Sequence, residues 1–287
     1  MHDIEAKTIL SPKNGMNLYR GCTHGCIYCD SRSECYGMTY TFEDVGVKRN
    51  APQLLETALR KKKAPCMIGT GSMSDPYLPL EETQRMTRSC LELIDKHGFG
   101  FSTITKSDLI LRDIDLLQSV NRKAKCVVQM TLTTYDDELC RILEPNVAVS
   151  SRRFEVLKEL QRAGIPTVVW MTPILPFIND TEENIRGLLE YCGDAGVKGI
   201  LTFGIGMTLR YGNREYFYKQ LDQHFPGMKR QYMRSFGSSY GIKSPNSRAL
   251  GKLVADFCKA NDMLCGTQAV FEYATQMEPP QTQLSLF

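Results

Sequence analysis

Short runs of apolar residues alternate with longer amphipathic runs over roughly the first 206 residues of the chain. Runs that are apolar throughout favour buried strands, whereas runs with apolar residues three or four positions apart favour helices. We expect strands at residues 16–20, 66–69, 100–105, 126–131, 166–172 and 199–203, and helices at residues 51–59, 83–96, 112–120, 152–163 and 181–195. Repeated strand–helix units predict a parallel sheet with helices outside it.

Several predicted helices carry end signals. Gly98, Gly164 and Gly196 each follow a helix, as C-terminal caps do. Asp180, with Glu183 three residues later, is expected to cap the last helix. Six strands are fewer than the eight of a closed barrel. The predicted fold class is therefore α/β, a partial (βα)6 parallel barrel, although a doubly wound sheet is compatible with the same pattern.

The alternation ends near Met207. Two further helices are expected at residues 213–225 and 247–260, separated by a stretch rich in Gly, Ser and Pro. We therefore expect a barrel at residues 1–206, a C-terminal extension packed on it at residues 207–276, and a flexible tail at residues 277–287. The tail contains a Pro-Pro pair and shows neither a helical nor a strand period.

Composition narrows the class of protein only slightly. The chain has 287 residues, 42% of them apolar, which is enough for one sizeable core. A net charge of +3 argues neither for nor against a nucleic-acid partner. No apolar run is long enough for a membrane span, and the first residues lack the pattern of a secretion signal. We expect a cytoplasmic protein with no membrane partner.

Three of the eleven cysteines, Cys22, Cys26 and Cys29, lie within eight residues, directly after the first predicted strand. Most of the others stand alone in apolar runs, as buried thiols do. Thiolates are the ligands of iron–sulfur clusters, and three of them leave one iron of a [4Fe–4S] cluster open to an exogenous ligand. A structural zinc site with His24 as fourth ligand is the alternative.

The Cys-x3-Cys-x2-Cys loop, with Tyr28 before its third cysteine, resembles the signature of the radical S-adenosylmethionine (SAM) superfamily. Further segments, at residues 69–77, 105–107, 144–145, 151–153 and 173–176, resemble its spore photoproduct lyase-like branch. The resemblance spans residue 16 to about residue 206 and implies a [4Fe–4S] cluster on the three cysteines. It also implies SAM on the open iron, reductive cleavage to a 5′-deoxyadenosyl radical, and an electron donor such as flavodoxin or ferredoxin.

The same resemblance suggests residues that bind SAM. Gly69, Thr70, Gly71 and Ser72 form the turn after the second strand, where the superfamily presents carbonyl groups to the SAM amino group. Ser72 replaces the acidic residue that the superfamily often has in this turn. Lys106, at the end of the third strand, is expected to pair with the SAM carboxylate. Arg153 is an alternative for this role, and the choice between it and its neighbour Arg152 stays open.

Candidates for catalysis are fewer. Ser72 stands where spore photoproduct lyase has a cysteine hydrogen donor, and a serine hydroxyl is a poor donor of hydrogen atoms, so we do not expect that enzyme's route. Asp75 and Tyr77, with Glu81 behind them, are candidates for the substrate side, although Asp-Pro also simply makes turns. Cys35 is either a hydrogen donor or, as we prefer, a spare thiol.

The last five residues resemble the pentapeptide by which bacterial replication and repair proteins bind the sliding DNA clamp. Gln283 would fix the register, and Leu284, Leu286 and Phe287 would fill an apolar groove. The alternative is an apolar tail without function. The motif favours a radical SAM enzyme that acts on DNA, in repair or base modification. Two other hypotheses are a radical SAM enzyme acting on RNA, a peptide or a small molecule, and a non-enzymatic metal-binding clamp adaptor.

Overall fold

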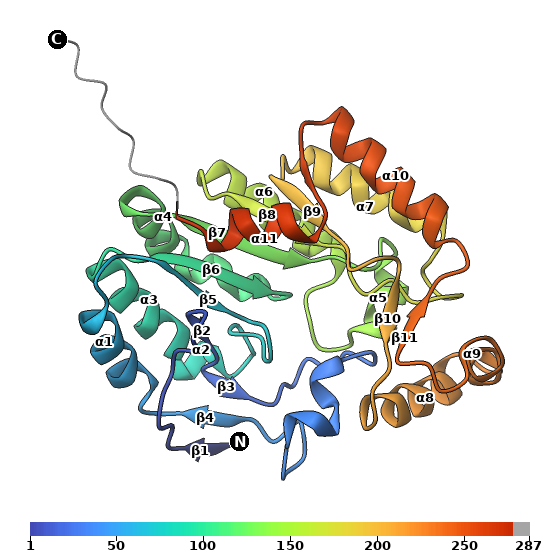
Figure 1. The fold of residues 1–287 in the computed structure, drawn as a ribbon, viewed down its shortest axis with the longest axis horizontal. Coiled ribbons are helices and arrows are strands. Elements are labelled where there is room, and N and C mark those ends of the chain that lie inside the picture. The colour runs from blue at the N-terminus through green and yellow to red at the C-terminus, as the bar shows by residue number, and fades with distance from the viewer. Residues whose placement is uncertain (278–287) are drawn as a thin grey trace.

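The computed structural model describes residues 1–277 and is built around one curved parallel sheet (Figure 1). Within these residues the sheet has seven strands, in the order β12-β9-β8-β7-β6-β5-β2, and its two edge strands are not paired with each other. The predicted open barrel of six strands is thus confirmed and extended by β12. The strands are β2 (Gly15–Met16), β5 (Met67–Thr70), β6 (Gly100–Thr105), β7 (Cys126–Thr131), β8 (Thr167–Trp170), β9 (Gly199–Leu201) and β12 (Leu264–Cys265).

Helices cover both faces of the sheet. Six helices form an arc outside its curve, while α11 (Thr267–Thr275) crosses the other face (Figure 1). Alternate residues of each strand point to opposite faces. Ile68 and Val128 therefore pack in the outer core, whereas Met67 and Val127 pack with Val270 of α11. The outer helices are α1 (Ala51–Lys61), α3 (Met86–Lys96), α4 (Ile114–Lys123), α6 (Ser150–Arg162), α7 (Glu182–Asp194) and α10 (Ser247–Ala260).

The predicted first strand, at residues 16–20, is wrong as one element. Its start is β2 of the barrel sheet, but its end, β3 (Tyr19–Arg20), belongs to a second small sheet with β4 (Gly46–Lys48) and β1 (His2–Ile4). Met16, before the break, and Leu18 and Tyr19, after it, are all apolar and buried, so hydrophobic pattern alone does not reveal the break. The result is that the residues directly before the cysteine loop lie beside the barrel rather than inside it.

Two predicted helices begin differently in the structure. Residues 83–96 are divided between α2 (Glu81–Gln84) and α3, because Arg85 between them has a φ of 49°. Residues 108–113 form a 3-10 turn ahead of α4. Thr181, not Asp180, caps α7, since its side chain accepts a hydrogen bond from the Asn184 amide. The Asp180 carboxylate instead accepts from the Phe177 amide, at 2.7 Å, and from the Ser244 hydroxyl.

Beyond the barrel, two short strands hold a helical insertion. Strand β10 (Gly206–Thr208) pairs antiparallel with β11 (Gly241–Lys243), and α8 (Asn213–His224) and α9 (Met228–Phe236) connect them. Phe217, Leu221 and Tyr232 of the insertion belong to one apolar cluster with Cys26 and Ile27. The insertion therefore packs against the cysteine loop (Figure 1).

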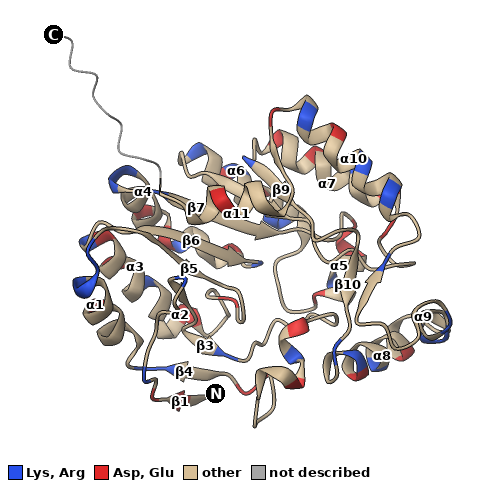
Figure 2. Ribbon diagram, viewed as in Figure 1, with Lys and Arg blue, Asp and Glu red and all other residues tan. Residues whose placement is uncertain are grey.

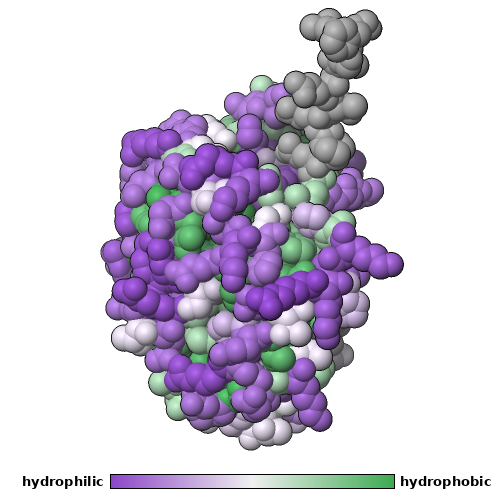
Figure 3. Space-filling view, turned by 90° about the vertical axis from the view of Figure 1, so that its left-hand side faces the viewer, coloured by the Kyte–Doolittle hydropathy of each residue, from purple (hydrophilic) through white to green (hydrophobic). Residues whose placement is uncertain are grey.

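None of the helices in residues 1–277 combines the length and the apolarity needed to cross a bilayer. The face drawn in Figure 3 is mostly hydrophilic, with small apolar patches between polar side chains. Apart from Met277, the predicted tail and its clamp-like pentapeptide lie outside the described residues.

A candidate active site at the open end of the barrel

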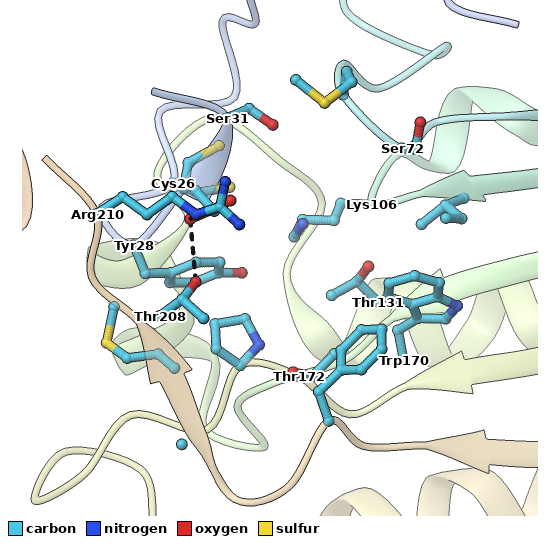
Figure 4. A pocket seen from close by; sticks show the side chains of 18 of the residues that line it. Cys26, Tyr28, Ser31, Ser72, Lys106, Thr131, Trp170, Thr172, Thr208 and Arg210 are labelled. Carbon is cyan, nitrogen blue, oxygen red and sulfur yellow. Dashed lines mark hydrogen bonds and ion pairs between the residues drawn. The ribbon is translucent and has the colours of Figure 1, made fainter. Parts of the chain in front are cut away.

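A cavity of about 730 Å³ lies at the carboxyl ends of the barrel strands (Figure 4). This end of a parallel barrel is where such folds place their chemistry. The cysteine loop forms one wall, the ends of β6, β7 and β8 form the opposite wall, and β10 and β11 close a third side. The volume is in the range of pockets that bind a cofactor or a drug-sized ligand.

Cys22, Cys26 and Cys29 all line this cavity, and the other eight cysteines do not. Burial and the neighbouring Cys29 raise the pKa of Cys22 to about 12, and burial also raises the pKa of Cys26. Metal binding requires thiolates, so loading this site releases protons. Three buried thiols on one wall of a roomy cavity fit a cluster with one open iron.

A single zinc ion fits this wall poorly. The ring of His24 turns to Asp75, with 3.5 Å between Nδ1 and the carboxylate. Within residues 1–277, no group of three or more His, Cys, Asp or Glu side chains could hold one metal ion.

The cysteine loop is held from behind by the end of α5 (Asp137–Leu143), a helix that the sequence pattern did not predict, and by the residues that follow it. The Ile27 amide donates to the Leu143 carbonyl at 3.0 Å. Asn146 donates its amide to the His24 carbonyl at 3.1 Å and its side chain to the Thr23 carbonyl at 2.9 Å. These bonds fix the loop backbone on both sides of Cys26.

A buried charged network lies beneath the same loop. The Tyr28 hydroxyl and the Arg153 guanidinium both donate to Glu144, and all three side chains are buried. Burial favours the neutral acid, but the charges of Arg153 and Lys106 hold the pKa of Glu144 below its ordinary value. Because Tyr28 lies between two of the cysteines, the network positions the loop.

The predicted contact between Arg153 and SAM does not agree with this placement. Arg153 does not line the cavity and is fully buried. Its guanidinium is already committed to Glu144 and to the carbonyls of Thr131, at 2.7 Å, and Ala148, at 2.6 Å. Arg152 lies on the surface and pairs with Asp108 and Glu159, so neither arginine faces the cavity.

The predicted turn after β5 does reach the cavity, but only in part. Gly71 and Ser72 line it, whereas Gly69 and Thr70 lie inside the strand. Gly71 has a φ of 98°, and a Cβ there would lie 2.2 Å from the Ile104 carbonyl oxygen, so the turn requires glycine. The Ser74 hydroxyl donates to the Gly21 carbonyl at 2.5 Å and ties this turn to the cysteine loop.

Lys106 and Asp75 both line the cavity, in different ways. The Asp75 carboxylate accepts hydrogen bonds from the Thr105 hydroxyl and the Lys106 amide, each at 2.8 Å, and so orients the end of β6. The Lys106 side chain extends into the cavity towards the cysteine wall (Figure 4). Burial opposes its charge, but Cys26 and Glu144 outweigh that effect and raise the pKa of Lys106. A charged ammonium at this position suits an anionic ligand group.

Three other candidates lie away from the cavity. Tyr77 is fully buried, and its hydroxyl has no hydrogen-bond partner among the described residues. Glu81 is buried and accepts from Tyr19 and Arg112. Cys35 is exposed, with Arg210 donating to its sulfur at 3.2 Å, which agrees with a spare thiol rather than a donor.

Sequence reasoning missed the aromatic and cationic side chains of the cavity mouth. Trp170 and Phe203, at the ends of β8 and β9, meet edge to face with ring centroids 5.4 Å apart. Arg210 lies between the rings of Tyr36 and Tyr240, at 5.6 and 5.1 Å from their centroids. Strand ends are a usable signal for the first pair, because barrel sites collect there. Arg210 and Tyr240 come from the insertion and have no such signal.

Comparison with known proteins agrees with this geometry. The model of the radical SAM superfamily matches residues 16–192. An uncharacterized protein of Methanocaldococcus jannaschii is 34% identical over 189 residues, which cover 62% of this chain and 69% of that protein. An uncharacterized protein of Mycobacterium tuberculosis is 28% identical over 225 residues, 76% of this chain and 65% of that protein.

Solved structures share the fold at low sequence identity. A spore photoproduct lyase variant with bound AdoMet and dinucleoside spore photoproduct has a TM-score of 0.62 and 12% identity, over 92% of this chain and 80% of that one. Streptococcus suis SuiB bound to S-adenosylmethionine has a TM-score of 0.51 and 13% identity, over 90% of this chain and 50% of that one. From the match over residues 16–192, we conclude that the chain belongs to the radical SAM superfamily and is an enzyme that uses a [4Fe–4S] cluster and SAM.

Proposed function

We propose that this enzyme abstracts a hydrogen atom from a nucleotide of DNA, in the repair or modification of a base, and that it works in the cytoplasm. The observation that carries the proposal is the mouth of the cavity. Trp170, Phe203 and Tyr240 supply aromatic faces there, and Arg210 and Lys243 supply positive charge. Aromatic faces that stack bases, next to cations that meet phosphates, are how proteins hold unpaired nucleotides.

The exposure of these rings supports an aromatic ligand. Phe203 is 57% exposed and Tyr240 is 52% exposed, although both line a cavity that is otherwise well formed. Trp170 is held in place because its indole NH donates to Gln129 at 2.8 Å. A base that enters between these side chains would remove their apolar surface from water, which is favourable.

The other residues that line the cavity have separate proposed roles. When bound, the cluster and SAM supply a 5′-deoxyadenosyl radical that takes a hydrogen atom from the substrate. Cys22, Cys26 and Cys29 hold the cluster, Lys106 pairs with an anionic group of SAM, and the turn at Gly71 and Ser72 brings backbone close to it. An electron donor such as flavodoxin or ferredoxin would reduce the [4Fe–4S] cluster.

Known relatives support a nucleic-acid substrate without excluding a peptide. Spore photoproduct lyase has been solved with a dinucleoside photoproduct, and SuiB with a precursor peptide. A protein of Pseudomonas phage M6, 27% identical over 175 residues, is named a radical SAM Nalpha-GlyT isomerase. The cavity wall near Ser72 carries no thiol, and the three cluster cysteines are the only thiols that line the cavity in the described chain. We therefore propose a reaction that does not use an enzyme thiol as hydrogen donor.

Deuterium transfer tests the substrate. Anaerobically reconstituted enzyme is supplied with SAM, a reductant and perdeuterated DNA, with and without ultraviolet irradiation, and 5′-deoxyadenosine is analysed by mass spectrometry. We expect deuterium in the product, and less of it for Phe203→Ala, with slow substrate-free SAM cleavage unchanged. Perdeuterated RNA and a perdeuterated peptide digest are the matched probes. Transfer from either of these and not from DNA would overturn the DNA assignment.

The C-terminal pentapeptide supplies a second, separable part of the proposal, which is docking on the bacterial sliding clamp. The described chain ends at the amino-terminal edge of the sheet, where Lys125 donates to the Gln276 carbonyl at 3.2 Å and Met277 lies near Gly100. This edge is opposite the cavity, because the strands run between them. A clamp bound by the last residues would therefore leave the cavity mouth open.

Removing the five residues 283–287 is expected to abolish binding to purified clamp while leaving the cluster and SAM cleavage intact. A short peptide buries little surface, so we expect an affinity of roughly 1 μM for the full chain, about 8 kcal/mol. The double variant Gln283→Ala, Phe287→Ala should behave like the deletion, and Gln281→Ala, just outside the motif, should bind normally. Equal clamp binding by the full and shortened chains, or by neither, would remove this part of the proposal.

A further inference from the structure

The helical insertion between β10 and β11 concentrates the positive charge of the chain. Residues 209–240, which make up the insertion, contain six Lys or Arg and two Asp or Glu, a net charge of +4, whereas the whole chain carries +3. The remaining residues are thus net negative. Lys and Arg positions lie along both α8 and α9 (Figure 2).

The charge of this segment is only partly neutralised, because Arg210 lies 3.5 Å from the Asp30 carboxylate and Lys229 pairs with Asp222. Its two acidic side chains are engaged, since Glu215 accepts from the Gly212 amide at 2.6 Å and Asp222 pairs with Lys229 at 2.7 Å. In residues 1–277, Arg230 and Arg234 have no ion-pair partner. They stand four residues apart on α9, where like charges destabilise a helix, and both line a shallow hollow of about 450 Å³.

Exposed apolar side chains gather on the same segment. Six large hydrophobic residues are exposed in the described chain, and four of them lie between residues 203 and 240. These four are Phe203, Tyr211, Met233 and Tyr240. Positive charge interleaved with exposed aromatic rings is the surface character of proteins that bind single-stranded nucleic acid.

The insertion is also joined rigidly to the cavity. Arg210 and Tyr240 stand at its two ends and both line the cavity, with the Arg210 guanidinium donating to the Tyr240 hydroxyl at 2.7 Å. Arg214 donates to the carbonyls of Leu209, at 2.8 Å, and Ser239, at 2.7 Å, and so holds the loop that carries Tyr240. The ends of the insertion and the cavity wall are thus parts of one hydrogen-bonded unit.

We propose that the α8–α9 insertion binds the backbone of a single nucleic-acid strand next to the reacting nucleotide. Phosphates lie against Arg230 and Arg234, and a neighbouring base stacks on Tyr211. This inference rests on the proposed function and deepens it, because it assigns the strand flanking the substrate to a defined surface. It requires unpaired bases, since stacked duplex bases do not offer their faces to side chains.

The test is a binding measurement on the reconstituted, full-length protein. The probe is a fluorescein-labelled DNA strand of about 12 nucleotides, within the range of sites that such surfaces cover, followed by anisotropy at several NaCl concentrations. Arg230→Ala, Arg234→Ala is expected to lower affinity about tenfold and to reduce the salt slope by about 1.4, as the loss of two single-strand phosphate contacts predicts. Tyr211→Leu should weaken binding with the salt slope unchanged.

The matched control is Arg122→Ala, Arg162→Ala. Both residues are exposed and stand at the ends of α4 and α6, at the edge of the sheet away from the cavity. The control removes the same charge and should bind DNA almost normally. Iron content and circular dichroism of all variants should match those of the unaltered protein.

The outcomes separate this inference from the proposed function. An equal loss of DNA affinity in both double variants, or no loss of affinity in Arg230→Ala, Arg234→Ala, overturns the assigned surface. Neither result affects the proposed function, which the deuterium-transfer experiment tests separately. Tighter binding of polyglutamate than of DNA assigns the surface to an acidic protein and overturns the inference. If the unaltered protein transfers deuterium from DNA but does not bind the labelled strand at low salt, the inferred binding surface is wrong and the proposed function stands.

Discussion

Replacing Cys22, Cys26 or Cys29 with alanine is expected to abolish both the cluster and the cleavage of SAM. The three thiols form one wall of the cavity, and no other cysteine of the chain lines it, so none can take over as ligand. The unaltered protein, reconstituted anaerobically, should carry about four irons and four sulfides. Each single variant should lose nearly all of both, and 5′-deoxyadenosine should not form under a strong reductant.

The matched controls are Cys35→Ala, Cys66→Ala and Cys126→Ala. Cys35 is exposed and hydrogen-bonded to Arg210, and Cys126 is buried in the outer core, and neither side chain lines the cavity. These variants should keep the iron, the sulfide and the reaction. Stoichiometric zinc without sulfide in anaerobically prepared protein would contradict the cluster assignment, as would full iron content in the Cys26 variant.

The sequence predicted best the strands and loops that consist of a continuous run of one kind of residue. Strands β6 and β7 begin and end where expected, because both faces of each are largely buried and every position except Gln129 is apolar or small. The sequence also brought Cys22, Cys26 and Cys29 together as one group, which the structure places on one wall of the cavity. Three ligands on one short loop form a local pattern, and the fold needs only to place that loop at a strand end.

The sequence predicted poorly what depends on partners that are distant along the chain. In the sequence, Arg153 resembles a free cation near the start of a helix. In the folded protein its guanidinium donates to Glu144 and to the Thr131 carbonyl. The cavity mouth depends on Arg210 and Tyr240, which approach the cysteine loop only because β10 and β11 pair. Pairing of this kind is a tertiary event, and no periodicity in the sequence encodes it.

Replacing Arg153 with methionine is expected to cost about 3–5 kcal/mol of unfolding free energy, the usual effect of breaking a buried ion pair. Arg153 and Glu144 are both fully buried, and methionine keeps the volume of the side chain but leaves the carboxylate without its countercharge. Because Glu144 also accepts from Tyr28, between two cluster cysteines, iron retention should fall as well. Urea unfolding under anaerobic conditions, followed by circular dichroism, measures the loss.

Arg152 provides the control within the same helix turn. Its pairs with Asp108 and Glu159 are on the surface, and exposed pairs contribute only about 0–1 kcal/mol, so Arg152→Met should be nearly neutral. Adding Glu144→Gln to Arg153→Met should recover part of the stability, since it removes the uncompensated charge, and a double variant that is less stable than Arg153→Met would point to lost packing instead. Equal losses of unfolding free energy for Arg152→Met and Arg153→Met would show that the buried Arg153–Glu144 pair does not stabilise the structure beneath the cysteine loop.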